Sequence, residues 1–142
     1  KVPFGIGTTI RRMADIPPIK GEDERQRFLD AVCSAAVKVS EEVGASAIAV
    51  LTHSGKTARI IARYRPTAPL IALTDYLPVI RRMSLVWGVQ TIPVESIEKT
   101  EKIFPIVARK IGEAGFRGKI VITAGIPTRE RSVTNTIHVV EI

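Results

Sequence analysis

The stretch AIAVLTHSGKT, residues 47–57, changes from apolar to polar near its midpoint. Its first five residues form a short, continuous apolar run, which is typical of a β-strand that helices cover on both faces of a parallel sheet. Hydroxyl residues and a glycine follow, and residues 58–64 then have the pattern of a short helix that ends before Pro66. A buried strand that leads through a polar turn into a helix predicts an α/β domain.

A longer helix is expected before this strand. From Phe28 onward, apolar residues recur at intervals of three and four, which predicts a helix with one buried face. Gly44 stands where a left-handed cap would end that helix. The residues expected on the buried face are Phe28, Val32, Ala36, Val39 and Val43.

The alternation of strands and helices continues to the end of the chain. Buried strands are expected over residues 70–73, 89–94 and 119–123, a terminal strand over 136–141, and helices over 78–86 and 103–114, with Gly115 closing the last helix. Pro105 predicts that this last helix starts late or kinks, after a separate turn at 96–99. The alternation requires a largely parallel sheet with helices on both faces.

Length and composition indicate one folded domain. The 142 residues are 45% hydrophobic and 25% charged, which is ordinary for a globular protein. No apolar run is long enough for a membrane span, and no secretory signal is recognisable at the N-terminus. The single Cys33 excludes an internal disulfide, has no neighbours at zinc-ligand spacing and is expected in the core. We therefore expect a cytoplasmic protein.

The N-terminal segment differs from the rest of the chain. Residues 1–24 are rich in glycine and proline and are interpreted as a linker or adaptor, and residues 25–142 as the folded domain. The chain begins at Lys1 without a methionine, which suggests a piece of something longer. Its net charge of +7 favours anionic partners but does not choose among them.

An anion site is expected in the turn after the first buried strand. In open α/β sheets, ligands bind beyond the carboxyl ends of the strands, where the winding order reverses. The turn, which we call the 52–57 loop, combines backbone N–H groups at a helix start with side chains that suit a phosphate. Its residues are Thr52, His53, Ser54, Gly55, Lys56 and Thr57.

This loop has two other interpretations. A nucleotide-binding P-loop would need a glycine five positions before Gly55, where Val50 stands, so that motif is excluded. A purely structural role, in which Ser54 caps the helix and Gly55 eases a tight turn, stays open.

A second loop, residues 124–135, contains Arg129 and Arg131. If the strands at 47–51 and 119–123 are neighbours, these arginines could reach a second phosphate or a ribose of the same ligand. A solvated surface loop is the equally good alternative.

The remaining residues suggest no catalytic or metal site. His53 and His138 have no local acid to orient either of them as a general base, so both are interpreted as ordinary histidines. Trp87 is expected to anchor a turn and has no stacking partner that would indicate nucleic acid. Arg59, Arg63, Arg65, Arg81 and Arg82 are interpreted as solvated helix residues.

Several stretches resemble the C-terminal domain of pyruvate kinase. The most specific is IAVLTHSGKTAR at 48–59, because it contains the whole 52–57 loop. Matching pieces follow in order at 64–66, 69–74, 81–85, 87–89, 118–125 and 134–137. The resemblance covers about residues 25–142.

The resemblance implies a three-layer α/β/α domain with a five-stranded, mostly parallel sheet whose last strand is antiparallel. It further implies that the 52–57 loop binds the phosphate of an allosteric effector, in particular through Thr52, Ser54, Gly55 and Thr57. The implied parent is a homotetrameric enzyme that transfers a phosphoryl group from phosphoenolpyruvate to ADP on a separate barrel domain, with magnesium and potassium. No catalytic residue is carried over, so this chain alone is expected to be inactive.

The sequence departs from the family pattern beside the second loop. Relatives commonly have a glycine immediately before the Thr-Asn pair and a Gly-Asp before the fourth strand, and Val133 and Lys119 occupy those places here. The effector therefore stays open among a sugar bisphosphate, a sugar monophosphate and a nucleoside monophosphate. A freestanding domain of this fold that binds or processes a phosphorylated metabolite, and a structural module with a vestigial loop, are the competing interpretations.

Overall fold

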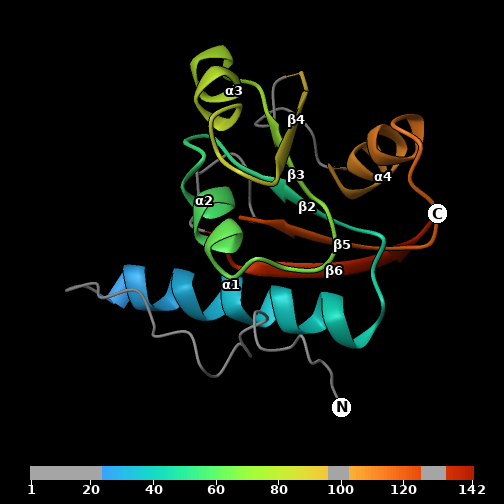
Figure 1. Ribbon diagram of the computed structural model, residues 1–142, viewed down its shortest axis with the longest axis horizontal. Helices are drawn as coiled ribbons and strands as arrows, with labels where there is room; N and C mark the ends of the chain where they lie inside the picture. Colours follow the sequence, from blue (N-terminus) through green and yellow to red (C-terminus); the bar gives the residue numbers. More distant parts are fainter. Residues whose placement is uncertain (1–23, 96–102, 126–133) are drawn as a thin grey trace.

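The structure is a computed structural model that describes residues 24–95, 103–125 and 134–142. A five-stranded sheet with the order β4-β3-β2-β5-β6 forms its centre (Figure 1). The strands are β2 (Ala47–Leu51), β3 (Leu70–Thr74), β4 (Val89–Pro93), β5 (Lys119–Ala124) and β6 (Thr136–Glu141).

The direction of winding reverses at the middle of the sheet. From β2 the chain proceeds outward through β3 to β4, and all three strands are parallel. It then returns to the other edge of β2, where β5 pairs in parallel with Ile48 opposite Val121. The last strand, β6, runs antiparallel to β5. The expected sheet, mostly parallel with an antiparallel last strand, is confirmed.

Helices cover both faces of the sheet, because the side chains of each buried strand alternate between two cores. Ile48 and Val50 of β2 face α1 (Glu24–Glu42), α2 (Lys56–Arg63) and α3 (Leu77–Met83). Ala49 and Leu51 face α4 (Ile103–Glu113). In Figure 1, α1 lies along one side of the sheet and α4 on the other, so the three-layer arrangement is confirmed.

The expected helix limits differ from the observed ones mainly in α3. This helix ends at Met83 and not at residue 86, because the next residues form tight turns: the Val86 N–H donates to the Met83 carbonyl, and Gly88 adopts a φ of +78°. Pro105 lies in the first described turn of α4, where proline is tolerated. The turn expected at 96–99 lies outside the described residues, as do residues 1–23 of the linker expected at 1–24, whose last residue, Glu24, begins α1.

The prediction of which residues of α1 are buried is wrong by about one position along the helix. Phe28 is 51% exposed, and Val32, Val39 and Val43 are only partly buried. Compared with the prediction, the helix is rotated about its axis, so that the polar residues Asp30 and Ser40 face the core. Apolar spacing in the sequence does not reveal this. The buried residues are Leu29, Asp30, Cys33, Ala36, Val37 and Ser40.

The two buried polar side chains of α1, Asp30 and Ser40, are hydrogen-bonded within the protein. The Tyr64 hydroxyl, at the end of α2, donates to Asp30 Oδ1 at 2.9 Å, and the Ser40 hydroxyl donates to the Val37 carbonyl at 2.7 Å. Burial and the nearby Asp30 raise the pKa of the Cys33 thiol to about 12. Burial and the bond to Asp30 also raise the pKa of Tyr64 to about 12.

These two groups predict a loss of stability at alkaline pH. Each has a higher pKa folded than unfolded, so its contribution is complete below the unfolded pKa and is lost as pH rises toward about 12. Urea unfolding from pH 8 to 11 should show the free energy of unfolding falling above about pH 9, by at most about 1.4 kcal/mol per pH unit per group.

In Cys33→Ala the fall should begin only near pH 10, where the tyrosine starts to ionise in the unfolded chain. Replacement of the exposed Tyr76 by phenylalanine should leave the profile unchanged. A wild-type free energy of unfolding that stays constant up to pH 11 would contradict the prediction.

Candidate functional site

The site predicted from the sequence lies where the winding of the sheet reverses. The strands β2 and β5 are neighbours, as the two-loop hypothesis requires, and both run toward the same edge. The 52–57 loop leaves the sheet from β2 at this edge. Arg129 and Arg131 lie outside the described residues, so their proposed approach to the same ligand stays a prediction.

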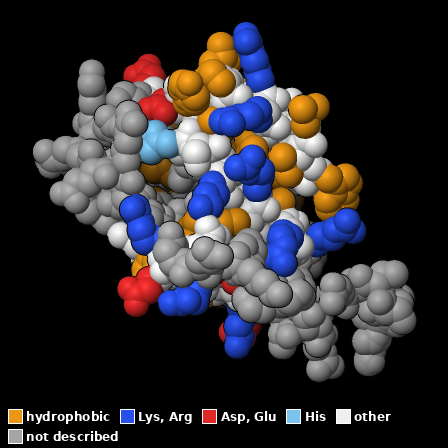
Figure 2. All heavy atoms as spheres, turned by 90° about the vertical axis from the view of Figure 1, so that its left-hand side faces the viewer, with side chains coloured by type: hydrophobic (Ala, Val, Ile, Leu, Met, Phe, Trp, Pro, Cys, Tyr) orange, Lys and Arg blue, Asp and Glu red, His pale blue; other side chains and the backbone are white. Residues whose placement is uncertain are grey.

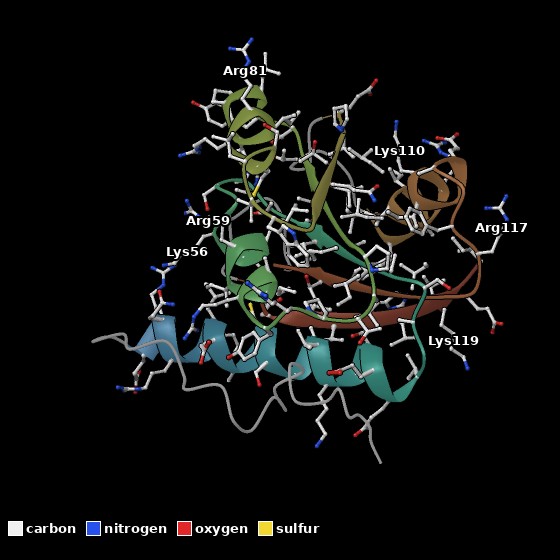
Figure 3. The ribbon with its side chains drawn as sticks, viewed as in Figure 1. Lys56, Arg59, Arg81, Lys110, Arg117 and Lys119 are labelled. Carbon is white, nitrogen blue, oxygen red and sulfur yellow. The ribbon has the colours of Figure 1, made fainter. Side chains whose placement is uncertain are left out.

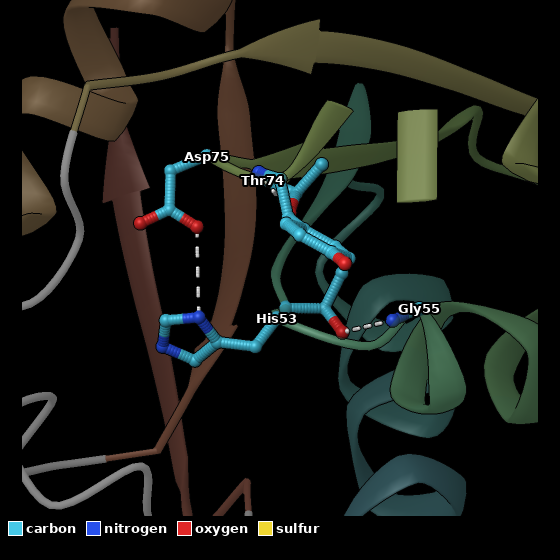
Figure 4. Close-up of polar contacts among 6 residues, drawn as sticks. His53, Gly55, Thr74 and Asp75 are labelled. Atoms are coloured by element: carbon cyan, nitrogen blue, oxygen red, sulfur yellow. Dashed lines mark hydrogen bonds and ion pairs between the residues drawn. The ribbon is translucent and has the colours of Figure 1, made fainter. Parts of the chain in front are cut away.

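Three hydrogen bonds shape the 52–57 loop, and Figure 4 shows the one at Gly55. The Thr52 N–H donates to the Leu73 carbonyl at 3.0 Å, which extends the pairing of β2 with β3. The Gly55 N–H donates to Thr52 Oγ1 at 2.9 Å, and the Lys56 N–H donates to Ser54 Oγ at 3.3 Å. The turn is therefore held from within before any ligand binds.

Gly55 is the N-cap residue of α2 and has a φ of +83°. A Cβ at this position would lie 2.9 Å from Met83 Cε and 3.3 Å from Val79 Cγ1. The left-handed backbone therefore favours glycine, and any Cβ here would displace the end of the buried Met83 side chain. Of the purely structural role considered for this loop, the part about Gly55 is confirmed, because Gly55 shapes the turn. The part about Ser54 is wrong, because the N-cap residue of α2 is Gly55.

The two threonines of the loop are buried and bonded inside the protein. Thr57 Oγ1 lies 2.9 Å from Thr134 Oγ1, which ties the first turn of α2 to the residues just before β6. Thr52 Oγ1 accepts the bond from Gly55. Ser54 and Lys56 are exposed, and Figure 3 shows Lys56 and Arg59 projecting outward from α2. The side chains open to an anion are therefore Ser54 and Lys56.

His53 has an acidic neighbour, contrary to the expectation from the sequence. Its Nδ1 lies 3.5 Å from Asp75 Oδ1 (Figure 4). Leu51 pairs with Leu73 in parallel register, so the residues two positions later, His53 and Asp75, leave the sheet side by side. His53 and Asp75 lie on different strand ends far apart in sequence, so no local pattern connects them, and only the pairing of β2 with β3 brings them together.

His138, Cys33 and Trp87 have the surroundings that follow. The ring of His138, on β6, stacks on Phe104 of α4 with centroids 4.3 Å apart. Cys33 is fully buried, as expected. Trp87 is 76% exposed, with the Arg65 guanidinium 5.3 Å from its ring centroid, so it does not anchor its turn by burial.

Residues 24–95, 103–125 and 134–142 contain neither a metal-binding cluster nor a membrane-spanning helix. No group of three or more His, Cys, Asp or Glu is placed to hold a metal ion. None of the helices there has the length and hydrophobicity needed to cross a membrane.

The sequence and the structure both match pyruvate kinases. Residues 30–140 match the family described as "Pyruvate kinase, alpha/beta domain". The pyruvate kinases of Clostridium acetobutylicum and Geobacillus stearothermophilus are 32% and 33% identical over 82% and 88% of this chain. A crystal structure of a pyruvate kinase from Cryptosporidium parvum superposes with a TM-score of 0.70 at 25% identity over 90% of this chain.

The matched region is a minor part of each of these proteins. The chain covers 25% of the Clostridium protein, 22% of the Geobacillus protein and 24% of the Cryptosporidium chain. The comparison therefore concerns one domain of proteins four to five times as long.

The contact between Gly55 and α3 can be tested with two glycine variants. Gly55→Ala and Gly88→Ala introduce a Cβ at nearly equal φ, +83° and +78°, so both should suffer backbone strain of about 1–2 kcal/mol. Only Gly55 has side-chain atoms within 4 Å of the added Cβ. Thermal unfolding should show a clearly larger fall in Tm for Gly55→Ala, and equal falls would show that Met83 moves aside without cost.

Proposed function

Since this chain belongs to the family of pyruvate kinase α/β domains, we propose that it is the regulatory and oligomer-forming domain of a pyruvate kinase and binds a phosphorylated effector at the 52–57 loop. The observation that carries the proposal is the position of this loop. It leaves β2 beside β5, where the winding reverses, and leads directly into the N-terminus of α2.

The chemistry of the loop supports an anionic ligand. The N-terminus of α2 presents backbone N–H groups and the positive end of the helix dipole. The exposed Ser54 hydroxyl and Lys56 ammonium lie at this end, and Arg59 follows one turn later. His53, in the same loop, lies 3.5 Å from Asp75 at the end of the neighbouring strand β3.

The catalytic part of the proposed parent enzyme would lie outside this chain. Phosphoryl transfer from phosphoenolpyruvate to ADP, which gives pyruvate and ATP, would take place on a barrel domain of about 250 residues, more than the 142 here. Magnesium and potassium would act in that domain. We further propose a cytoplasmic homotetramer, in which this domain contacts the barrel and other copies of itself.

Binding should be measurable on the isolated chain. A sugar bisphosphate, a sugar monophosphate and a nucleoside monophosphate are titrated separately, and at least one should raise Tm, because it binds the folded state. Ser54→Ala and Lys56→Ala should each weaken that ligand about tenfold in calorimetry, because a charge-assisted hydrogen bond contributes about 1.5–3 kcal/mol. Both side chains are exposed, so the variants should fold.

Lys110→Ala is the matched control, because Lys110 lies on α4 and not near the 52–57 loop (Figure 3). It should leave the affinity unchanged. Arg129→Ala or Arg131→Ala should weaken a bisphosphate more than a monophosphate if the second loop holds a distal phosphate. No change of Tm with any of the three ligand classes would contradict the proposed site.

The isolated chain should convert no phosphoenolpyruvate and ADP to pyruvate and ATP, because the barrel is not included in it. A coupled assay of pyruvate formation measures this, with an intact pyruvate kinase as the positive control. Turnover that persists across independent preparations would instead favour a freestanding protein that processes a phosphorylated metabolite.

A further inference from the structure

A buried pair of hydroxyl groups joins two distant parts of the chain at the candidate site. Thr57 Oγ1, in the first turn of α2, lies 2.9 Å from Thr134 Oγ1, and the two residues are only 6% and 5% exposed. Thr134 is itself held against the sheet, because the next N–H group, that of Asn135, donates to the Ala124 carbonyl at the end of β5 at 3.0 Å. The pair therefore ties the start of α2 to the sheet.

The first turn of α2 has two backbone donors without a partner. The Gly55 and Lys56 N–H groups donate to hydroxyl oxygens within the 52–57 loop, and the Arg59 N–H donates to the Gly55 carbonyl at 3.0 Å. Between them, the N–H groups of Thr57 and Ala58 bond to no described residue. Ala58 is fully buried and Thr57 nearly so, and a helix start that is buried in this way needs a hydrogen-bond acceptor.

The charge around this helix start suits an anionic acceptor. Helix α2 carries Lys56, Arg59 and Arg63 and no acidic residue. Figure 2 shows Lys and Arg side chains spread over the left-hand side of Figure 1, where α2 lies, with Asp and Glu nearer the margins of this face. Together with the positive end of the helix dipole, these side chains favour a group such as the phosphate of the proposed effector.

The direction of the first turn is fixed from outside the loop. The N-cap residue, Gly55, has no side chain that could orient the turn. The Thr57 hydroxyl supplies this constraint through its bond to Thr134. A hydrogen bond weakens steeply when its angle departs from linearity, so the direction of the turn decides how well its N–H groups can bind an anion.

We propose that Thr134 is a positioning residue of the effector site. Its hydroxyl holds Thr57 so that the N–H groups of Thr57 and Ala58 both point at the phosphate of the effector, and Thr134 does not itself contact the ligand. The inference rests on the proposed function, because it requires that the 52–57 loop binds a phosphate. It adds to that function a residue beside β6, outside the loop, on which the affinity depends.

The experiment measures binding to the isolated chain by calorimetry. The probes are inorganic phosphate, glucose 6-phosphate, fructose 1,6-bisphosphate and AMP, titrated separately. Thr134→Val keeps the shape of the side chain and removes its hydroxyl, and it should weaken the tightest-binding probe about tenfold. Thr134→Ser keeps the hydroxyl and should bind that probe within about twofold of the wild type.

A double-mutant cycle separates positioning from an independent contribution. Thr57→Val removes the other hydroxyl of the same bond, so Thr57→Val/Thr134→Val should weaken the probe no more than Thr57→Val alone. Two independent effects would instead multiply to about a hundredfold. The double variant leaves neither hydroxyl of the pair without its partner, so it should fold even where a single variant is too unstable to measure.

Thr123→Val is the matched control. Thr123 is a fully buried threonine of β5, the strand that pairs with β2, and its Oγ1 has no hydrogen-bond partner. Its replacement by valine breaks no hydrogen bond and removes an unpaired polar group. The control should therefore leave the affinity unchanged and should not lower Tm.

Three results would overturn the inference. The first is a Thr134→Val variant that has a lower Tm but binds the probe as tightly as the wild type, which would make the bond a structural tie alone. The second is a Thr134→Ser variant that binds as weakly as Thr134→Val. The third is equal weakening by Thr123→Val. A wild-type chain that binds none of the probes would contradict the proposed function, and the inference with it, before any variant is compared.

Discussion

The whole arrangement depends on the burial of β2 on both faces and along both edges. All five of its residues are buried. A buried strand must have its backbone N–H and C=O groups bonded on each side, and β3 and β5 supply these bonds. Its side chains alternate between two cores, which require helices above and below the sheet. The reversal of winding at β2 follows from this central place, and with it the position of the 52–57 loop.

The same constraint explains how polar residues meet at the site. Parallel strands end at one edge of the sheet, so His53 after β2 comes beside Asp75 after β3. Thr57, in the first turn of α2, reaches Thr134 across a long separation in sequence. Gly55 lets the loop approach Met83 of α3, so packing and hydrogen bonding hold the loop together. A preformed loop of this kind would lose little conformational freedom if it bound an anion, as we propose.

Most of the fold was predictable because each element is short and has a clear pattern. The expected strands lie within one residue of those observed, and the terminal strand at 136–141 coincides with β6. The errors occur where contacts between elements decide the result. The buried face of α1 includes Asp30, which a search for apolar spacing passes over, because its hydrogen bond from the Tyr64 hydroxyl comes from another part of the chain. The helix α3 ends early because its turns bond back to the helix.

The sequence by itself determined the strand-turn-helix unit at 47–57, the alternation that leads to a mostly parallel sheet, and the family to which the chain is similar, because these follow from local patterns and motifs. Only the tertiary structure decided which hydroxyls of the loop are used internally and which face solvent, that His53 has an acidic neighbour, and that Trp87 and Leu85 stay exposed. These properties depend on which elements pack together, and no local pattern contains that information.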